Sequence, residues 1–257
     1  MREEKDQPSA LQHAISALRS ARTVLAITGA GISKDAGLPT YRGTGGLYEG
    51  GKTADDIPIE VALSGHMLLK RPEVAWNHIS QIEKACRGVE PSAGHRALKD
   101  LEQHCQLTVL TQNIDGLHHK AGSSDVIEIH GNVYRLRCDG CGYQTQLDDY
   151  RSLETLPPPC PHCSGSLRPD VVLFGEMLPT KAIDRYYAAL AGEPDVVLSI
   201  GTTSVFPYIA GPVEEARQRG GTAIEINPGK TEVSHACDIR LGVTAAETLP
   251  AIVAGLA

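Results

Sequence analysis

The stretch VLAITGAGISKDAGLPTYRG, residues 24–43, begins like the strand and phosphate-binding turn of a dinucleotide-binding fold. Gly29 and Gly31 follow an apolar run, as such a turn requires, but Lys34 stands where the third glycine belongs. No strand ends in an obvious ribose-binding acid at the usual distance of roughly 20 residues, which argues against an ordinary dehydrogenase. The helix after the turn still offers N–H groups to a phosphate, and the Arg42 guanidinium can pair with a pyrophosphate. We expect an anion site here, with an ordinary tight turn as the alternative.

Strand-like and helix-like segments alternate along most of the chain. Buried parallel strands are expected at the short apolar runs, which occupy residues 23–28, 107–110, 126–129, 196–200 and 223–226. Helices are expected where apolar residues recur at helical spacing, at residues 9–22, 94–104 and 212–219. Such alternation is typical of a parallel α/β sheet.

Two segments interrupt this alternation. Residues 45–92 hold glycines and a helical stretch at 72–86 but no strong strand, and residues 134–169 hold two CxxC pairs and three consecutive prolines. We therefore predict an α/β protein with a Rossmann-like parallel sheet, a helical insertion and a small zinc-ribbon module. The large domain is expected from residues 9–44, 93–133 and 170–257, and the small domain from residues 45–92 and 134–169.

The composition of the 257 residues bounds the class of protein. The formal net charge of −7 gives no broad attraction to nucleic acid or to an anionic membrane, so we expect neither as a direct partner. The charged N-terminal residues lack the apolar core of a secretory signal, and no apolar run approaches the roughly 20 residues of a membrane span. We expect a cytoplasmic protein, and the sequence makes no prediction of its oligomeric state.

The cysteines give the strongest purely physical signal. Cys138 and Cys141 form one CxxC pair, Cys160 and Cys163 form a second one, and 18 residues lie between the two pairs. Two such pairs can place four thiolates tetrahedrally around one Zn²⁺, and four cysteine ligands leave no open position for catalysis. We predict a structural zinc; unliganded or disulfide-linked cysteines are the alternative.

Polar residues follow several of the expected strands. In an open parallel sheet, ligands gather at the carboxyl ends of the strands, so these residues should line one crevice. They are Gln112, Asn113 and Asp115, then His130, then Gly201, Thr202, Thr203 and Ser204, and finally Asn227. His130 has the ordinary pKa, near ~6.5, of a general base at neutral pH. The alternative to ligand binding at 113–115 is a turn that caps the following helix, and the alternative to a general base at position 130 is a histidine without a functional role.

Taken together, these segments resemble the sirtuin family, in particular bacterial-type members, which are NAD-dependent protein lysine deacylases. The matching motifs, in family order, are GAGIS (29–33), GLPTYRG (37–43), TQNID (111–115), HG (130–131), CxxC…CxxC (138–163), PDVVLFGE (169–176), GTTSVFP (201–207) and EIN (225–227). None is specific alone, but jointly they span nearly the whole chain.

The resemblance implies roles for individual residues. NAD would contact Gly29, Ala30, Gly31, Ser33, Tyr41, Arg42, Gln112, Asn113, Ile114, Asp115, Gly201, Thr202, Thr203, Asn227 and Ala245. The acyl-lysine peptide would pair as a strand with Val172, Leu173, Phe174, Gly175 and Glu176. His130 and Asn113 would be catalytic: Asn113 helps to order the ribose and a water, and His130 is the general base.

The reaction that this implies cleaves NAD instead of reducing it. Nicotinamide leaves as the acyl-amide oxygen of the substrate attacks the ribose, and His130 then activates a ribose hydroxyl. The products are nicotinamide, free lysine and O-acyl-ADP-ribose. Zinc would take no direct part, since it holds the module that forms one wall of the peptide cleft.

Departures from the family pattern concern specificity. Many sirtuins have Pro-Asp-Phe-Arg where this chain has Pro-Thr-Tyr-Arg at 39–42, and the helix at 73–82 lacks the Tyr-x-x-Arg pair of desuccinylating members. We therefore expect a deacetylase or a deacylase for longer neutral acyl groups. No functional role is assigned to the histidines and cysteines outside the motifs. His118 and His119 are expected to be exposed, and Cys86, Cys105 and Cys237 to be buried thiols.

Two further functions compete with deacylation. An ADP-ribosyltransferase would use the same NAD crevice and differ only in its products. A non-catalytic module that binds NAD or ADP-ribose beside a zinc ribbon would have no need of a base at His130, and it would bind NAD without releasing nicotinamide.

Overall fold

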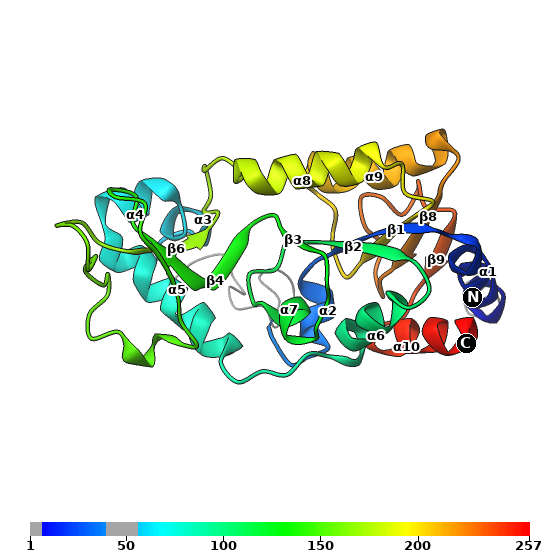
Figure 1. The fold of residues 1–257 in the computed structure, drawn as a ribbon, viewed down its shortest axis with the longest axis horizontal. Helices are drawn as coiled ribbons and strands as arrows, with labels where there is room; N and C mark the ends of the chain where they lie inside the picture. The colour runs from blue at the N-terminus through cyan, green and yellow to red at the C-terminus, as the bar shows by residue number, and fades with distance from the viewer. Residues whose placement is uncertain (1–6, 40–55) are drawn as a thin grey trace.

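The computed structural model describes residues 7–39 and 56–257 of the chain. Its largest feature is a six-stranded parallel sheet in the order β3-β2-β1-β7-β8-β9 (Figure 1). The strands are β1 (Thr23–Thr28), β2 (Gln106–Thr111), β3 (Val126–Glu128), β7 (Val196–Ile200), β8 (Thr222–Ile226) and β9 (Ile239–Leu241). Five of them match the predicted apolar runs. This is the strand order of the Rossmann fold, which confirms the predicted α/β class.

The order of the strands reverses at the middle of the sheet. From β1 the chain proceeds outward to β2 and β3, and from β7 it proceeds outward on the other side to β8 and β9. Thr28 at the end of β1 pairs with Thr111 of β2 and with Ile200 of β7. Because the connections diverge here, a crevice forms beyond the carboxyl ends of β1 and β7.

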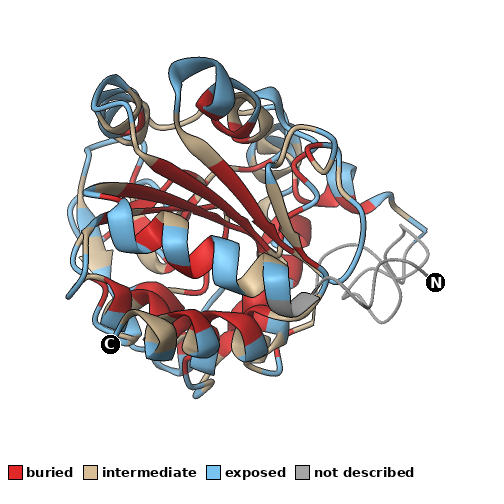
Figure 2. Cartoon of the chain, turned by 90° about the vertical axis from the view of Figure 1, so that its right-hand side faces the viewer, coloured by how far each residue is buried: buried red, intermediate tan, exposed pale blue. Residues whose placement is uncertain are grey.

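Helices cover both faces of this sheet. One face carries α1 (Gln7–Ser20), α6 (Ala93–Leu101) and α10 (Ala245–Leu256), and the other carries α8 (Thr180–Ala191) and α9 (Pro207–Ala216). Figure 2 shows the central strands as buried, whereas the flanking helices alternate between buried and exposed residues. The near-continuous apolar strands follow from this, since a sheet covered on both faces has no polar side.

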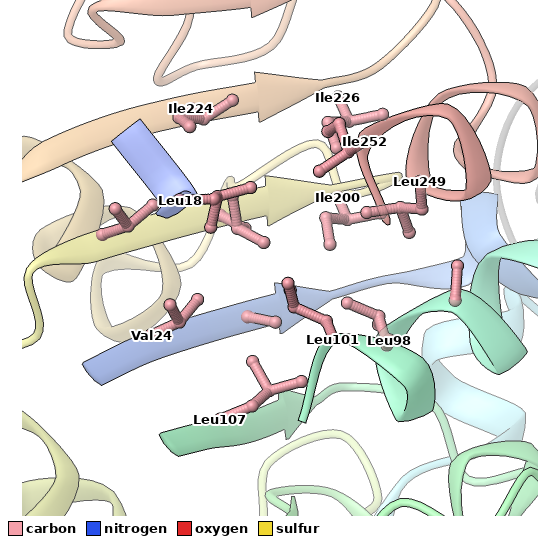
Figure 3. Packing of buried hydrophobic residues seen from close by; sticks show 14 of the residues in the cluster. Leu18, Val24, Leu98, Leu101, Leu107, Ile200, Ile224, Ile226, Leu249 and Ile252 are labelled. Carbon is pink, nitrogen blue, oxygen red and sulfur yellow. The ribbon is translucent and has the colours of Figure 1, made fainter. Parts of the chain in front are cut away.

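The first face shows how the layers are joined. Leu18 of α1 and Leu249 and Ile252 of α10 pack over strand residues such as Ile200 and Ile226, and all five are at most 1 % exposed (Figure 3). Full burial of such a side chain stabilises by ~1.5–3 kcal/mol. The packed layer therefore holds the strand ends, and with them the crevice, in place.

A second, antiparallel sheet lies at the opposite end of the molecule (Figure 1). Its order is β5-β4-β6, from β4 (Gly131–Arg137), β5 (Gln144–Gln146) and β6 (Arg168–Val171). The strand β4 starts directly after His130, so only Ile129 and His130 separate it from β3 of the parallel sheet. The sequence did not predict these three strands, because Arg135, Arg137 and Arg168 interrupt the apolar pattern with ion-paired cations.

Helices from the insertion pack against this second sheet. They are α3 (Ile59–Ala62), α4 (Gly65–Lys70) and α5 (Pro72–Cys86), of which α5 coincides with the predicted helix at 72–86. Trp76 of α5 is fully buried in one cluster with Leu136 and with Tyr150 of the 3-10 helix η1 (Tyr150–Ser152). This cluster joins the two segments that the sequence assigned to a small domain; the domain boundaries themselves stay a prediction.

The remaining short helices are α2 (Ala30–Lys34), α7 (Leu117–Lys120) and the 3-10 helix η2 (Arg217–Arg219). The exposure expected for His118 of α7 is wrong, because its side chain is 2 % exposed and its Nε2 lies 2.9 Å from the Thr28 hydroxyl. His119 is exposed as expected, with half of its side chain accessible. Cys86 is buried as expected, whereas Cys105 and Cys237 are partly exposed.

Candidate active site

A cavity of about 820 Å³ opens at the carboxyl ends of the parallel strands. It collects predicted site residues from five strand ends and from the segment after β6. Those of the predicted residues that line it are Gly29, Ala30, Gly31, Gln112, Asn113, His130, Val172, Leu173, Phe174, Gly175, Glu176, Gly201, Thr202, Thr203, Asn227 and Ala245. The expectation that polar strand ends form one crevice is confirmed for these residues. Asp115 instead lines a smaller cavity, and Ser204, which is 2 % exposed and lies 3.4 Å from the Ser199 hydroxyl, lines neither.

The glycines of the opening turn serve packing within the protein. A Cβ on Gly31 would lie 2.6 Å from the Gly201 Cα, and one on Gly29 would lie 2.7 Å from the Thr202 Cβ. The Gly31 N–H donates to the Gly201 carbonyl at 2.8 Å, and the Gly29 N–H donates to the Ile200 carbonyl at 3.0 Å. The turn therefore needs two glycines to lie against the end of β7, and these two N–H groups are already used inside the protein.

A buried polar cluster continues from β2. The Asn113 amide donates to the Gly29 carbonyl and to the Ser33 hydroxyl, both at 3.0 Å, and Ser33 donates to an Asp115 carboxylate oxygen at 2.6 Å. The other Asp115 oxygen accepts the Leu117 N–H at 2.9 Å. The pKa of Asp115 is raised above its ordinary value, because the effect of burial exceeds the opposite effect of these hydrogen bonds. No cation pairs with this carboxylate among the residues the structure describes, so it is free to accept further N–H donors.

A small second cavity adjoins this cluster. Ser33, Asn113 and Asp115 line its polar side, and Leu38, Pro39, Ile82, Ala85 and Cys86 line its apolar side together with Ala30. Polar acceptors lie at one end of this cavity and apolar walls elsewhere, and its volume of about 20 Å³ has room for roughly one water molecule.

His130 lies at the end of β3 with both ring nitrogens in contact. Its Nδ1 is 3.0 Å from the Gln112 carbonyl oxygen, and its Nε2 is 2.6 Å from the hydroxyl of Tyr208. Because a carbonyl oxygen can only accept, Nδ1 carries the proton and the Nε2 lone pair faces the cavity. Burial lowers the pKa of His130, so the neutral imidazole that a general base requires is the favoured form near neutral pH.

The far end of the cavity is formed by β7, β8 and α10. Thr202 is the central residue: its hydroxyl accepts from the Gln112 amide at 2.8 Å, and its carbonyl accepts from the Asn227 amide at 3.0 Å. Ala245 starts α10, whose next N–H, that of Ala246, donates to the Asp35 carboxylate at 2.9 Å. These contacts fix the positions of Thr202, Asn227 and Ala245 before any ligand is bound.

The predicted substrate segment, residues 172–176, already uses most of its main-chain donors. The N–H groups of Val172 and Phe174 donate to the carbonyls of His130 and Leu63, each at 2.9 Å. The Leu173 N–H donates to the Glu176 carboxylate, which also forms a two-pronged ion pair with Arg168 at 2.6 and 2.8 Å. The Glu176 side chain therefore orders the segment from within, and the predicted strand pairing with a peptide stays a prediction.

Some predicted residues stand apart from the cavities. Tyr41 and Arg42 lie outside the described residues. The Ile114 side chain packs against the apolar cluster of Trp76, and its carbonyl accepts the Val133 N–H at 2.9 Å. Sequence reasoning in turn assigned no role to several residues that line the large cavity: Lys34, Asp35, Leu178, Val205, Phe206, Tyr208, Ile226, Pro228 and Thr244. Val205, Phe206 and Ile226 belong to quoted motifs, whereas the others are signalled only by a neighbouring motif or predicted contact residue.

The four predicted zinc ligands come together at one end of the second sheet. The sulfur atoms of Cys138, Cys141, Cys160 and Cys163 all lie within 4.8 Å of one another, with Cys138 and Cys163 at 3.5 Å. A disulfide bond is about 2.05 Å long, so these thiols are unbonded. A tetrahedron with Zn–S bonds of about 2.3 Å has sulfur atoms just under 4 Å apart, which this arrangement fits.

Comparison with known proteins bears on this geometry. A model of the Sir2 family matches residues 29–207. The chain belongs to the Sir2 family. It is 46 % identical over 251 residues to the NAD-dependent protein deacylase 2 of Pseudomonas aeruginosa, covering 96 % of this chain and 98 % of the other. It is 36 % identical over 252 residues to the NAD-dependent protein deacylase of Thermococcus kodakarensis, covering 93 % of both.

Solved structures of Sir2 proteins share the whole fold. A Sir2 homologue in complex with NAD superposes with a TM-score of 0.85 at 31 % identity, covering 95 % of this chain and 93 % of that one. A Sir2 protein with a p53 peptide and NAD⁺ gives a TM-score of 0.79 at 25 % identity, covering 93 % of this chain and 95 % of that one. In the described part of this Sir2 protein, no helix has the length and apolar character that a membrane crossing demands.

Proposed function

We propose that this Sir2 protein is an NAD-dependent protein lysine deacylase that releases nicotinamide and O-acyl-ADP-ribose. One observation carries the proposal: His130, with its proton on Nδ1, lines the same cavity as the polar strand ends and the segment at 172–176. The likeness to proteins named NAD-dependent protein deacylases supports it.

The residues fit NAD in three parts. Asp115 and Asn113, beside the small cavity, would hold the nicotinamide carboxamide, with Asp115 accepting its N–H. Gln112 would meet the adjoining ribose, and Thr202 and Asn227 would hold the adenosine side. The remaining residues predicted to contact NAD are proposed for the same role: Gly29, Ala30, Gly31, Ser33, Tyr41, Arg42, Ile114, Gly201, Thr203 and Ala245. NAD, when bound, supplies the electrophilic ribose carbon and the hydroxyl that accepts the acyl group.

His130 would take the proton from that hydroxyl. Its Nε2 carries the lone pair, because the Gln112 carbonyl holds the proton on Nδ1 and fixes the orientation of the ring. A low pKa keeps the imidazole neutral and able to accept a proton at neutral pH. Asn113, tied to the Gly29 carbonyl, would orient the ribose and a water.

Zinc would hold the module that contains the second sheet. Four thiolate ligands leave no open coordination position, so the metal stabilises and does not catalyse. Seven cysteines without a disulfide bond suit a reducing compartment, and we place the activity in the cytoplasm for that reason.

A neutral acyl group fits the surroundings of His130. Val172, Leu178, Val205 and Phe206 line the same cavity as this histidine, and none of them carries a charge. Among the described residues that line the cavity, the one lysine or arginine is Lys34 at the end of α2, so a succinyl or malonyl carboxylate buried among the uncharged side chains would lack a counter-ion there, which is costly. We propose acetyl or longer neutral acyl-lysine in proteins or peptides as the substrate.

The test is product analysis by mass spectrometry with NAD and matched acetyl-, butyryl- and succinyl-lysine peptides. His130→Ala is compared with His104→Ala, which changes an exposed histidine. Nicotinamide and O-acyl-ADP-ribose from the wild type and from His104→Ala, and neither from His130→Ala, is the expected result. ADP-ribose on protein with the acyl group retained would replace deacylation by ADP-ribosyl transfer, and faster desuccinylation than deacetylation would overturn the neutral-acyl preference.

A further inference from the structure

Tyr208 is the one group in the described cavity that touches the reactive nitrogen of His130. Its hydroxyl lies 2.6 Å from Nε2, and its ring is nearly perpendicular to the imidazole with centroids 6.1 Å apart. Phe206 stacks on Tyr208 with ring centroids 5.5 Å apart and also meets the edge of the imidazole. The two aromatic rings therefore hold the hydroxyl on the lone pair.

The backbone of Tyr208 is fixed by an unusual arrangement at the start of α9. A helix would pair the Tyr208 carbonyl with the N–H four residues later, but that residue is Pro212, which has no N–H. The hydroxyl of Tyr186 on α8 donates to this carbonyl at 2.8 Å instead. Pro212 thus leaves the Tyr208 carbonyl without a helical N–H donor, and the Tyr186 hydroxyl donates to it instead. This hydrogen bond connects the start of α9 to α8.

The direction of the hydrogen bond follows from the partners. Nδ1 of His130 holds its proton because it faces the Gln112 carbonyl, so Nε2 can only accept. Burial raises the pKa of Tyr208 to about 12, which keeps its hydroxyl protonated and able to donate. Tyr208 is the donor and His130 the acceptor.

We infer that Tyr208 is a positioning residue that caps the base: in the free protein its hydroxyl occupies the Nε2 lone pair of His130, and it must leave when the substrate hydroxyl binds. This inference rests on the proposed function of His130 and deepens it. A neutral imidazole nitrogen has one lone pair, so Tyr208 and a ribose hydroxyl cannot both donate to it. The cap therefore stabilises the free protein relative to the NAD complex.

Other titratable groups near His130 are accounted for by separate contacts. On β3 and β4, Glu128 pairs with Arg135 at 2.6 Å, and on β6 Asp170 pairs with the same arginine at 3.4 Å. Glu176 pairs with Arg168, and Asp35 accepts the Ala246 N–H at 2.9 Å. Lys34 lines the cavity from the end of α2. A variant of Tyr208 leaves all of these groups in place, so its effect on His130 is separable from theirs.

The inference is tested by NMR of the histidine side chains in the protein without NAD. Tyr208→Phe removes only the hydroxyl, and Tyr187→Phe, which changes an exposed tyrosine of α8, is the matched control. His130 is assigned by the signals that His130→Gln loses. Because the Tyr208 hydroxyl can donate to neutral Nε2 and can turn to accept from protonated Nε2, the readout is taken at a pH where His130 is neutral. The ¹⁵N resonance of Nε2, which an accepted hydrogen bond moves upfield, should move downfield in Tyr208→Phe. Tyr186→Phe, which frees the backbone but keeps the capping hydroxyl, should move it less in the same direction.

Kinetics give a second readout. Without the cap, the KM for NAD should fall about two- to tenfold, because NAD no longer displaces a hydroxyl from Nε2, and kcat should change less than KM does. An unmoved Nε2 resonance in Tyr208→Phe, or a fall in kcat without a fall in KM, overturns the cap. If the wild type forms no O-acyl-ADP-ribose, the proposed function fails, while the Nε2 resonance still decides whether Tyr208 caps His130.

Discussion

Gly31→Ala tests the packing of the first turn against β7. Gly31 lies in α2, where a backbone φ that any residue adopts would by itself favour alanine by about 1 kcal/mol. The new Cβ, however, would lie 2.6 Å from the Gly201 Cα and 2.8 Å from its carbonyl oxygen, against ordinary contacts of 3.4 Å or more. The turn would have to move by about 0.8 Å, the difference of these values, away from a backbone that cannot yield.

The expected cost combines overpacking, about 1–3 kcal/mol, with the weakened hydrogen bond from the Gly31 N–H to Gly201, about 1 kcal/mol. After the helix preference of alanine is subtracted, the net destabilisation is about 2 kcal/mol, which lowers the melting temperature by about 4–8 °C for a chain of this size. NAD affinity, measured by calorimetry, should fall about tenfold or more because the cavity wall shifts.

Gly192→Ala is the control for this experiment. Gly192 caps the end of α8 in the right-handed helical conformation, and a Cβ there would meet its neighbours at the ordinary distance of 3.4 Å, so the same substitution should leave the melting temperature unchanged or raise it. Equal melting temperatures and equal NAD affinities for Gly31→Ala and the wild type would refute the argument that close approach demands glycine at position 31.

Three further predictions concern the second sheet and the base. Removing zinc with a chelator should red-shift the fluorescence of Trp76, the sole tryptophan, because Trp76 shares one apolar cluster with Cys138 and Cys160; an unshifted spectrum after proven metal loss would show that the cluster stands without the metal. Glu176→Gln should raise the KM for the peptide several-fold and leave NAD binding unchanged, since it weakens the ion pair that orders residues 172–176; an equal loss of NAD affinity contradicts this. The kcat/KM of the wild type should fall only below about pH 6.5, because burial lowers the pKa of His130 from that ordinary value and the base must be neutral; a midpoint above it contradicts the burial argument.

The parallel sheet and most of the site were predictable because they depend on local patterns. A strand buried on both faces must be a continuous apolar run, and Val24, Val109 and Leu198 belong to such runs. The polar strand ends follow from the same runs, since parallel strands end at one edge. The strand β9 was missed because three residues with Arg240 at the centre make no such run, and the Arg240 charge is paired with Glu225 on the neighbouring strand.

Other parts depend on contacts between distant residues. Tyr208 reads as the second residue of a helix after Phe-Pro, and only the three-dimensional structure places its hydroxyl on His130. The burial of His118 depends on its contact with Thr28, 90 positions away in the sequence. The ion pair between Glu176 and Arg168 shows that a motif residue expected to meet substrate can have its side chain engaged inside the protein.

The central position of β1 has a consequence for synthesis on the ribosome. Val24 pairs with Leu107 on one side and with Val196 on the other, and the second partner follows 172 residues later. At about 5–20 residues per second, β1 waits roughly 10–35 seconds for β7 to be made. Five of its six residues are buried in the finished sheet, so an apolar strand with an open edge is presented to the cell throughout that interval. The nascent chain is therefore most in need of chaperone protection before residue 200 has emerged.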